Sequence, residues 1–146
     1  DRPREVREAN MADGKYFDLR IISPDRIFYE GEASMLELTT SEGEIGIYKK
    51  HIPLTALIAP GIVTITEKDG QKKAAVHTGF LEVLPDKVTI LAETVEWPEE
   101  IDVHRAEEAK MRAQKRLEAK DANINTKRAE IALRKALVRI ELTEKK

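Results

Sequence analysis

Residues 61–79, GIVTITEKDGQKKAAVHTG, carry the clearest secondary-structure signal in the chain. Val63 and Ile65 alternate with threonines, which is the period of a strand with one buried face. Asp69 and Gly70 follow, two residues that tolerate positive φ in a tight turn, and a second apolar run comes after them. The stretch therefore predicts a β-hairpin that turns at Asp69-Gly70.

The flanking sequence repeats this pattern of short apolar runs and turn residues. Residues 17–22, FDLRII, form one such run, and residues 27–44, IFYEGEASMLELTTSEGE, predict two strands that separate near Glu30-Gly31. Residues 80–93, FLEVLPDKVTILAE, predict another hairpin, with its bend at Pro85-Asp86. Many short strands at regular spacing are typical of an antiparallel sandwich or barrel, and about 80 residues suffice for a small core.

The chain changes character after residue 98, since no glycine, proline or aromatic residue occurs beyond that point. Asp102 is predicted to cap a first helix that runs to about Lys120, and a second helix is predicted from near Asn125 to about Thr143. The DANIN stretch between them is short, so the two helices are expected to be antiparallel neighbours.

The apolar faces of the two predicted helices are rich in alanine. At helical spacing they comprise Ala106, Ala109, Ala113 and Leu117 in the first helix, and Ala129, Ala132, Leu133, Ala136, Leu137 and Ile140 in the second. Each buried methylene-sized group contributes only about 0.8 kcal/mol, so an alanine seam holds two helices weakly. Each helix has good intrinsic propensity, and the hairpin is therefore expected to open without melting either helix.

Composition excludes several classes of protein. The chain has no cysteine, which excludes disulfides, thiolate catalysis and zinc–cysteine sites. The longest apolar stretch, residues 52–65, contains two prolines and is shorter than the roughly 20 residues that span a bilayer. Residues 1–98 carry 12 basic and 17 acidic side chains, whereas residues 99–146 carry 13 basic and 10 acidic ones. A basic tail on an acidic body indicates an electrostatic partner.

The stretch 43–61, GEIGIYKKHIPLTALIAPG, raises the question of whether His51 is catalytic. The sequence shows no nucleophile, carboxylate or second ligand that would be expected next to His51. His77 and His104 are not spaced from His51 as metal ligands would be. We therefore predict no catalytic residue and no metal site, and interpret the stretch as a structural and docking turn. The residues of this predicted turn are Gly43, Gly46, His51, Pro53, Pro60 and Gly61.

The residues of this turn, together with HTGFLEV at 77–83 and IDVHRA at 101–106, closely resemble the epsilon subunit of bacterial F-type ATP synthases. The resemblance runs from about Tyr16 to Leu142. It implies an α+β fold, with an N-terminal antiparallel β-sandwich (residues 11–98) followed by a C-terminal antiparallel two-helix hairpin (residues 99–146). Residues 1–10 precede Met11 and are expected to be an expression remnant or a disordered extension.

The resemblance also implies a role. Epsilon subunits belong to the rotating central stalk of the proton-translocating enzyme, where the sandwich rests on the gamma subunit and the ring of c subunits and helps couple ion flow to ATP synthesis. The hairpin impedes ATP hydrolysis when it extends along gamma toward the alpha and beta subunits. The implied location is the cytoplasmic face of the bacterial membrane, with membrane association only through the complex and no nucleic-acid partner.

Basic side chains on the hairpin predict a further ligand. Arg105 and Arg112 share one face of the first helix, and an antiparallel partner brings Lys135 and Arg139 toward them, as a polyphosphate would require. By resemblance, the motif Ile101–Ala106 belongs to epsilon subunits that bind ATP. ATP, with or without magnesium, would then be a regulatory ligand and no cofactor would be required. The implied ATP residues are Glu96, Asp102, Arg105, Arg112, Lys135 and Arg139.

Lys135 occupies a position at which ATP-binding members have arginine. Lysine offers a point charge in place of the planar guanidinium, and this weakens the predicted site. The resemblance also implies inhibitory contacts of the extended hairpin with acidic loops of beta. Those contacts would be made by Arg128, Arg134, Lys135 and Arg139.

Other interpretations of the basic hairpin remain. Its charges could simply form a solvated helix face with weak i,i+4 pairs. A nucleic-acid-binding module is disfavoured because the helices lack aromatic residues for stacking and the sandwich is acidic. An enzyme is disfavoured by the lack of a Walker-type phosphate loop. Within the family, the serious alternative is a purely structural stalk subunit whose hairpin never extends.

Overall fold

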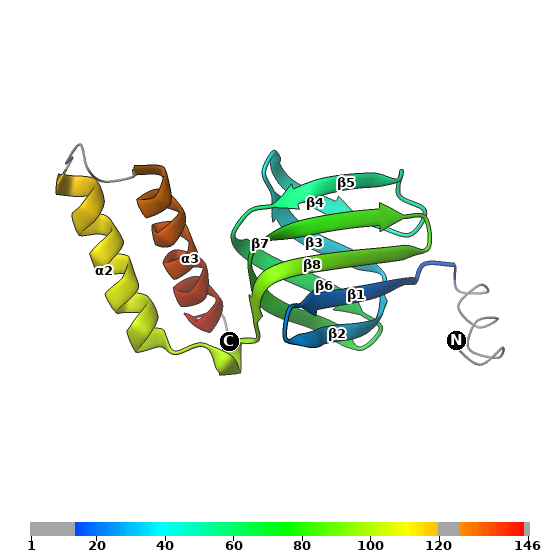
Figure 1. The fold of residues 1–146 in the computed structure, drawn as a ribbon. Coiled ribbons are helices and arrows are strands. Elements are labelled where there is room, and N and C mark those ends of the chain that lie inside the picture. The colour runs from blue at the N-terminus through cyan, green and yellow to red at the C-terminus, as the bar shows by residue number, and fades with distance from the viewer. Residues whose placement is uncertain (1–13, 120–125, 145–146) are drawn as a thin grey trace.

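The computed structural model describes residues 14–119 and 126–144. Figure 1 shows strands packed in two layers, with two antiparallel helices beside one end of them. The predicted α+β fold, a β-sandwich followed by a helical hairpin, is confirmed. The strands are β1 (Phe17–Ser23), β2 (Arg26–Ala33), β3 (Met35–Thr40), β4 (Gly43–Ile47), β5 (Leu54–Ile58), β6 (Gly61–Glu67), β7 (Gly70–Leu84) and β8 (Lys87–Glu96). The helices are the short 3-10 helix η1 (Pro98–Glu100), α2 (Val103–Ala119) and α3 (Thr126–Glu144).

The long strand β7 connects the two layers. It pairs with β6 from Gly70 to Val76, with β8 from Ala75 to Leu84, and with β5 from Gly79 onward. Thr78, between these two partners, has φ of +60°, unusual for a β-branched residue. Gly79 is required by close packing, because a Cβ there would lie 2.4 Å from the Leu91 carbonyl oxygen. Both predicted hairpins therefore share this one strand.

The turns agree with the sequence in part. β7 and β8 meet at Pro85-Asp86, as predicted, whereas β6 and β7 turn at Lys68-Asp69, one residue before the predicted Asp69-Gly70, because Gly70 already begins β7. The predicted strand break at Glu30-Gly31 is wrong, since β2 continues through Gly31 and the break falls at Ser34. The tyrosine ring of Tyr29 lies over Gly31, where a Cβ would meet the phenol oxygen at 2.8 Å, so this glycine accommodates a ring rather than ending a strand.

The sandwich is closed by pairing between its first and last strands. β1 pairs with β8 in parallel, whereas the other strand pairs are antiparallel. The sheet order is β2-β1-β8-β7-β5-β3-β4, with β6 joining β3 to β7. Alternate residues of these strands face inward, and the core includes the fully buried side chains of Phe17, Leu19, Ile21, Leu36, Ile47, Ile65, Leu81 and Ile90.

The hairpin follows the predicted helices closely. The Asp102 carboxylate accepts a hydrogen bond of 3.1 Å from the Arg105 backbone N–H, which confirms the predicted cap of α2. The second helix begins at Thr126, next to the predicted Asn125. The predicted connection, residues 121–125, and the predicted N-terminal extension, residues 1–10, lie outside the described residues.

The alanine seam is present, with changes at its edge. The seam buries Ala106, Ala113, Ala129 and Ala136. Ala132 and Leu137 were expected in it, but both are exposed, Leu137 by 43%. The reason is that α3 also packs on the sandwich, which turns the helix so that Val138 and Leu142 are buried instead. Within the described residues, no helix is long and apolar enough to cross a membrane.

Candidate functional site

The hairpin meets the sandwich through one helix, α3, which packs on β6, β7 and η1. A small apolar cluster forms this contact, with Val138 and Leu142 of α3 against Ala75 of β7 and Ile101. Ile62 of β6 packs at its edge. This cluster is separate from the main core of the sandwich, so the docked position of the hairpin depends on few buried side chains.

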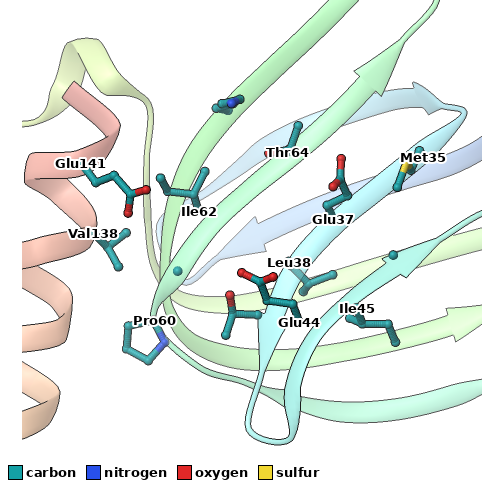
Figure 2. A pocket seen from close by; sticks show the side chains of 14 residues that line it. Met35, Glu37, Leu38, Glu44, Ile45, Pro60, Ile62, Thr64, Val138 and Glu141 are labelled. Carbon is teal, nitrogen blue, oxygen red and sulfur yellow. The ribbon is translucent and has the colours of Figure 1, made fainter. Parts of the chain in front are cut away.

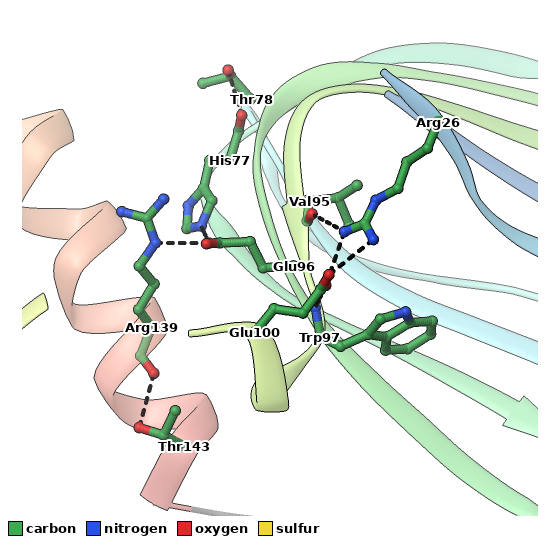
Figure 3. Close-up of polar contacts among 9 residues, drawn as sticks. All are labelled: Arg26, His77, Thr78, Val95, Glu96, Trp97, Glu100, Arg139 and Thr143. Carbon is green, nitrogen blue, oxygen red and sulfur yellow. Dashed lines mark hydrogen bonds and ion pairs between the residues drawn. The ribbon is translucent and has the colours of Figure 1, made fainter. Parts of the chain in front are cut away.

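A shared carboxylate forms the polar half of the contact. Glu96, the last residue of β8, accepts a hydrogen bond from Arg139 Nε of α3, with 2.7 Å between Nε and the Oε1 oxygen. The same oxygen lies 3.1 Å from Nε2 of His77 on β7. Figure 3 shows these three side chains converging between the sandwich and α3. The arrangement ties two strands and one helix to a single carboxylate.

The protonation of Glu96 reports on this contact. Burial acts to raise the pKa of Glu96, but the hydrogen bonds from His77 and Arg139 and their charges outweigh it. The pKa of Glu96 therefore lies below its ordinary value of 4.5. The docked state is stabilised by the ionised carboxylate above pH 4.5, and this contribution is lost as the pH falls through the lowered pKa.

A second ion pair fixes the chain where it leaves the sandwich. Arg26 of β2 binds Glu100 of η1 with both terminal nitrogens, at 2.8 and 2.9 Å. Glu100 also accepts a hydrogen bond from the Trp97 backbone N–H at 2.8 Å (Figure 3), and the Trp97 ring stacks on Phe28. The root of the hairpin is therefore held firmly, whereas its far end carries no comparable contact with the sandwich in the described residues.

The structure brings together only part of the predicted ATP site. Glu96 and Arg139 are in contact, and Asp102 is occupied as the helix cap. Arg105 and Arg112 are exposed on α2, and Arg112 lies 3.9 Å from Glu108 of its own helix. The half-buried Lys135 is one helical turn from Arg139 on α3. Because α2 and α3 are antiparallel, Arg105 lies at the level of Arg139, and Arg112 lies toward Lys135.

The four residues predicted to contact beta all lie on α3. Arg128 and Arg134 are exposed there, and Arg128 has a further polar or electrostatic interaction. Arg139 stands apart because its guanidinium is already bound to Glu96. A contact of Arg139 with another subunit would therefore require α3 to leave the sandwich first.

The six residues of the predicted docking turn do not form one turn. Gly43 has φ of +124° at the β3–β4 turn, as a bend requires, but Gly46 lies inside β4 and forms no bend. Pro53 and Pro60 limit β5 at opposite ends, as predicted. His51 lies at the Pro53 end, where its Nδ1 is 2.8 Å from the Ile52 carbonyl oxygen.

The other end of β5, at Pro60, lies near α3. Pro60 and Gly61 line a groove of about 550 Å³ between the β3–β4–β6 face and α3, shown in Figure 2. Glu37, Glu44 and Glu141 project along it, with Lys73 also in its wall. Among the described residues no group of three or more histidine, aspartate or glutamate side chains is arranged to hold a metal ion.

An exposed apolar row crosses the outer face of the other layer. Strand pairing aligns it across β5, β7, β8, β1 and β2. This outer stripe consists of the exposed side chains of Leu57, Phe80, Leu91 and Ile27, together with the half-buried Ile22. Leu57 and Leu91 are 62% and 51% exposed, which is costly for a surface that remains in water. Period-2 alternation in these strands predicts that each has one buried and one exposed face. It does not predict which exposed side chains lie next to one another, because the strand register joins residues that are far apart in the sequence.

Sequence reasoning missed two parts of the contact between sandwich and hairpin. The sequence patterns test His77 only as a metal ligand, and they do not single out Val138. The signal that could have found His77 is its place inside an apolar strand, where a histidine with 1% exposure needs a partner.

Comparison with known proteins agrees with this architecture. Residues 16–98 match the family model of the ATP synthase delta/epsilon chain β-sandwich domain, and residues 99–144 match that of the delta/epsilon chain long α-helix domain. The ATP synthase epsilon chain of Caldanaerobacter subterraneus subsp. tengcongensis is 46% identical over 132 residues, which cover 90% of this chain and 96% of that relative. The epsilon chain of Halalkalibacterium halodurans is 47% identical over 125 residues, covering 85% and 94%.

Among solved structures, a chain of the Euglena gracilis mitochondrial ATP synthase (OSCP/F1/c-ring, rotational state 1) has the same fold, with a TM-score of 0.76 at 23% identity. The match covers 87% of this chain and 80% of that chain.

Replacing Glu96 by glutamine is expected to weaken docking of α3. Glu96→Gln keeps the shape of the side chain but removes its charge, and a hydrogen bond to a charged partner contributes about 1.5–3 kcal/mol. At pH 7 we expect α3 amides to lose hydrogen-exchange protection by about 1–2 kcal/mol. Glu99→Gln, the same change at an exposed residue of η1, is the control. Unchanged protection of α3 in Glu96→Gln would contradict the assignment.

The difference between wild type and Glu96→Gln is also expected to depend on pH. Because the pKa of Glu96 is lowered in the docked state, the difference is full above pH 4.5 and disappears as the pH falls further. The measurement is the same exchange experiment repeated between pH 6 and pH 3.5, after correction for intrinsic exchange rates. A difference that does not shrink as the pH falls below 4.5 would show that charge at Glu96 does not hold α3.

Proposed function

The chain belongs to the delta/epsilon family of ATP synthase subunits, and from that membership we propose that it is a non-catalytic central-stalk subunit that regulates ATP hydrolysis through its helical hairpin. The sandwich binds the gamma subunit and the ring of c subunits. The hairpin rests on the sandwich in the permissive state and extends along gamma toward alpha and beta in the inhibitory state. The complex lies at the cytoplasmic face of a bacterial membrane and couples proton flow to ATP synthesis.

The observation that carries this proposal is the smallness of the contact between α3 and the sandwich. Two large side chains, Val138 and Leu142, are buried there, each contributing about 1.5–3 kcal/mol, together with the Glu96–Arg139 ion pair. The docked and undocked states then differ by a few kcal/mol, which is the range in which a partner can shift the equilibrium. A fixed structural domain would be expected to join the main core.

Arg139 supports the two-state proposal independently. The docked helix directs this guanidinium to Glu96, whereas the proposed inhibitory contacts use it, with Arg128, Arg134 and Lys135, against acidic loops of beta. One side chain cannot make both contacts at once. The two positions of the hairpin are therefore mutually exclusive, and the contacts with beta weaken as salt concentration rises.

Cross-linking tests whether the hairpin moves. Ile62 and Val138 pack together and face each other across the groove in Figure 2, so Ile62→Cys and Val138→Cys can be joined by a short thiol cross-linker in a chain that has no other cysteine. In the assembled ATP synthase we expect the cross-linked subunit to relieve inhibition of ATP hydrolysis, severalfold relative to the same variant without cross-linker. Equal hydrolysis in both samples would favour a purely structural stalk subunit whose hairpin never extends.

We propose that ATP is a regulatory ligand of the docked hairpin. Its phosphates would be held by Arg105, Arg112, Lys135 and Arg139, and its adenine amine by Glu96, while Asp102 keeps α2 in place. The antiparallel packing of α2 on α3 supports this assignment, because it gathers four cations along one side of the hairpin. Lys135 in place of arginine, and the existing bond between Glu96 and Arg139, both lower the expected affinity.

Calorimetric titration of the whole chain with ATP, with and without magnesium, tests this ligand. We expect saturable binding that Arg105→Ala weakens at least tenfold, because a guanidinium bound to phosphate contributes more than 1.4 kcal/mol. Lys110→Ala removes one positive charge from a different face of α2 and should bind ATP as wild type does. Absence of binding at millimolar ATP, or equal loss in both variants, would argue against a specific site.

We propose that the outer stripe is the surface that binds gamma, and that the turn at His51 and Pro53 faces the c ring. Tyr48, Ile52 and Leu84 expose apolar surface at that turn, by 56%, 78% and 43%. A hydrogen bond of 2.7 Å from the Lys50 N–H to the Pro85 carbonyl joins the two loops that carry them. An apolar face and an apolar end on one domain suit a subunit placed between two partners.

A charge in the outer stripe is expected to weaken binding to gamma without unfolding the chain. Leu91 is 51% exposed, so Leu91→Glu should leave the thermal unfolding temperature nearly unchanged while weakening binding to purified gamma by tenfold or more. Lys87→Glu, an exposed charge change outside the stripe on the same strand, is the control for altered net charge. Equal affinities for the two variants would mean that gamma binds elsewhere.

A further inference from the structure

The two oxygens of the Glu96 carboxylate differ in what they contact. Oε1 lies 2.7 Å from Nε of Arg139 and 3.1 Å from Nε2 of His77. No hydrogen bond or ion pair joins Oε2 to another residue that the structure describes. In that part of the chain, the one buried side-chain nitrogen or oxygen without a partner is Nδ1 of His77, so Oε2 is in contact with solvent. Glu96 therefore presents one held oxygen and one open acceptor.

His77 holds Oε1 from the sandwich side of the contact. Its ring is 1% exposed, and close packing leaves it little freedom to turn. The pKa of Glu96 lies below its ordinary value, so the ionised carboxylate can only accept, and Nε2 of His77 carries a proton toward it in either charge state of the ring. Arg139 holds the same oxygen from α3, as Figure 3 shows. Two donors on one oxygen limit rotation of the carboxylate and so fix the direction of Oε2.

The open acceptor stands at one end of the row of cations proposed to bind phosphate. Glu96 contacts Arg139, and Arg105 lies at the level of Arg139 because α2 and α3 are antiparallel. Arg112 and Lys135 continue this row along the hairpin. A carboxylate repels phosphate, so a nucleotide bound along the row is expected to place its base, rather than its phosphates, at Glu96.

A fixed carboxylate oxygen distinguishes purines by the group at the 6-position of the ring. Adenine carries an amine there, which donates to the oxygen, whereas hypoxanthine, the base of ITP, carries an oxo group that only accepts. A carboxylate that is free to turn could instead accept from the ring N–H next to that oxo group. The hold on Oε1 prevents this turn. Discrimination between ATP and ITP therefore depends on how Glu96 is held as well as on its charge.

We propose that His77 is a positioning residue that sets the base specificity of the nucleotide site, by holding Glu96 with Oε2 open to the amine of adenine. The inference rests on the proposed ATP site and assigns the origin of its specificity. Wild type is expected to bind ATP about tenfold or more tightly than ITP, because a site built to accept from a substrate amine rejects an analogue that lacks it.

The test compares ATP and ITP by calorimetric titration of the whole chain and of two matched variants of His77. His77→Gln carries an amide nitrogen at about the reach of Nε2 and should keep the discrimination of wild type. His77→Asn carries the same amide one bond closer to the backbone, beyond reach of Glu96, and should reduce the ratio of the two affinities to about threefold or less. His51→Asn, the same change at the Pro53 end of β5, should leave the ratio as in wild type.

The ratio of the two affinities separates positioning from a merely structural role. Weaker packing around residue 77 would lower the affinities for ATP and ITP together and leave their ratio unchanged. Loss of the ratio in His77→Asn, with its retention in His77→Gln, requires a donor that reaches Glu96. Equal ratios in the two variants, whether both high or both low, would overturn the proposal.

A second measurement uses wild type alone and does not depend on a variant that folds. In proton–nitrogen spectra the buried His77 Nε2–H should give a signal that persists when ATP is added, because the bond to Oε1 stays in place while Oε2 binds the base. Disappearance of this signal on saturation with ATP would show that Glu96 leaves His77 to bind the nucleotide, which overturns the proposal.

Failure of this inference can be told apart from failure of the proposed ATP site. A wild-type chain that binds ATP and ITP equally well has a nucleotide site whose specificity does not come from Glu96 and His77. A wild-type chain that binds neither nucleotide at millimolar concentration has no such site, which overturns both proposals.

Discussion

The Glu96 carboxylate links the sandwich to the helical hairpin through its ion pair with Arg139. It is partly buried, and a carboxylate withdrawn from water must find donors. Its donors come from β7 and from α3, residues 19 and 43 positions away along the chain. Removing either donor leaves the charge less well solvated than in an open sandwich. The docked hairpin is therefore specific in its position although it buries little apolar surface.

The two halves differ in how they are stabilised. The sandwich has one continuous core to which its eight strands contribute side chains. The hairpin is held together by an alanine seam, and it is held on the sandwich by the four-residue cluster around Val138. Alanine contacts permit close helix packing with small burial, so α2 and α3 can be long and regular without binding each other tightly. Stability in the sandwich and adaptability in the hairpin follow from side-chain size rather than from chain length.

Local patterns were the part of the fold that the sequence could predict. Strand period and turn residues located the β6–β7 hairpin to within one residue and the β7–β8 hairpin at Pro85-Asp86, and capping chemistry located the start of α2. Gly31 misled because its role is to make room for a tyrosine ring rather than to end a strand. At the site, Glu96 and Arg139 were expected together from the resemblance. His77 was missed because its contacts depend on strand register and on how α3 rotates to bury Val138, which helical period alone does not specify.

The parallel pairing of β1 with β8 has a consequence for how the chain is made. β1 can pair with β8 only after β8, which ends at Glu96, has been synthesised. The sheet therefore cannot close until nearly all of the domain has left the ribosome. The helices are synthesised last and reach a surface that is already complete. The order of synthesis therefore lets the sandwich close before the helices that pack on it are complete.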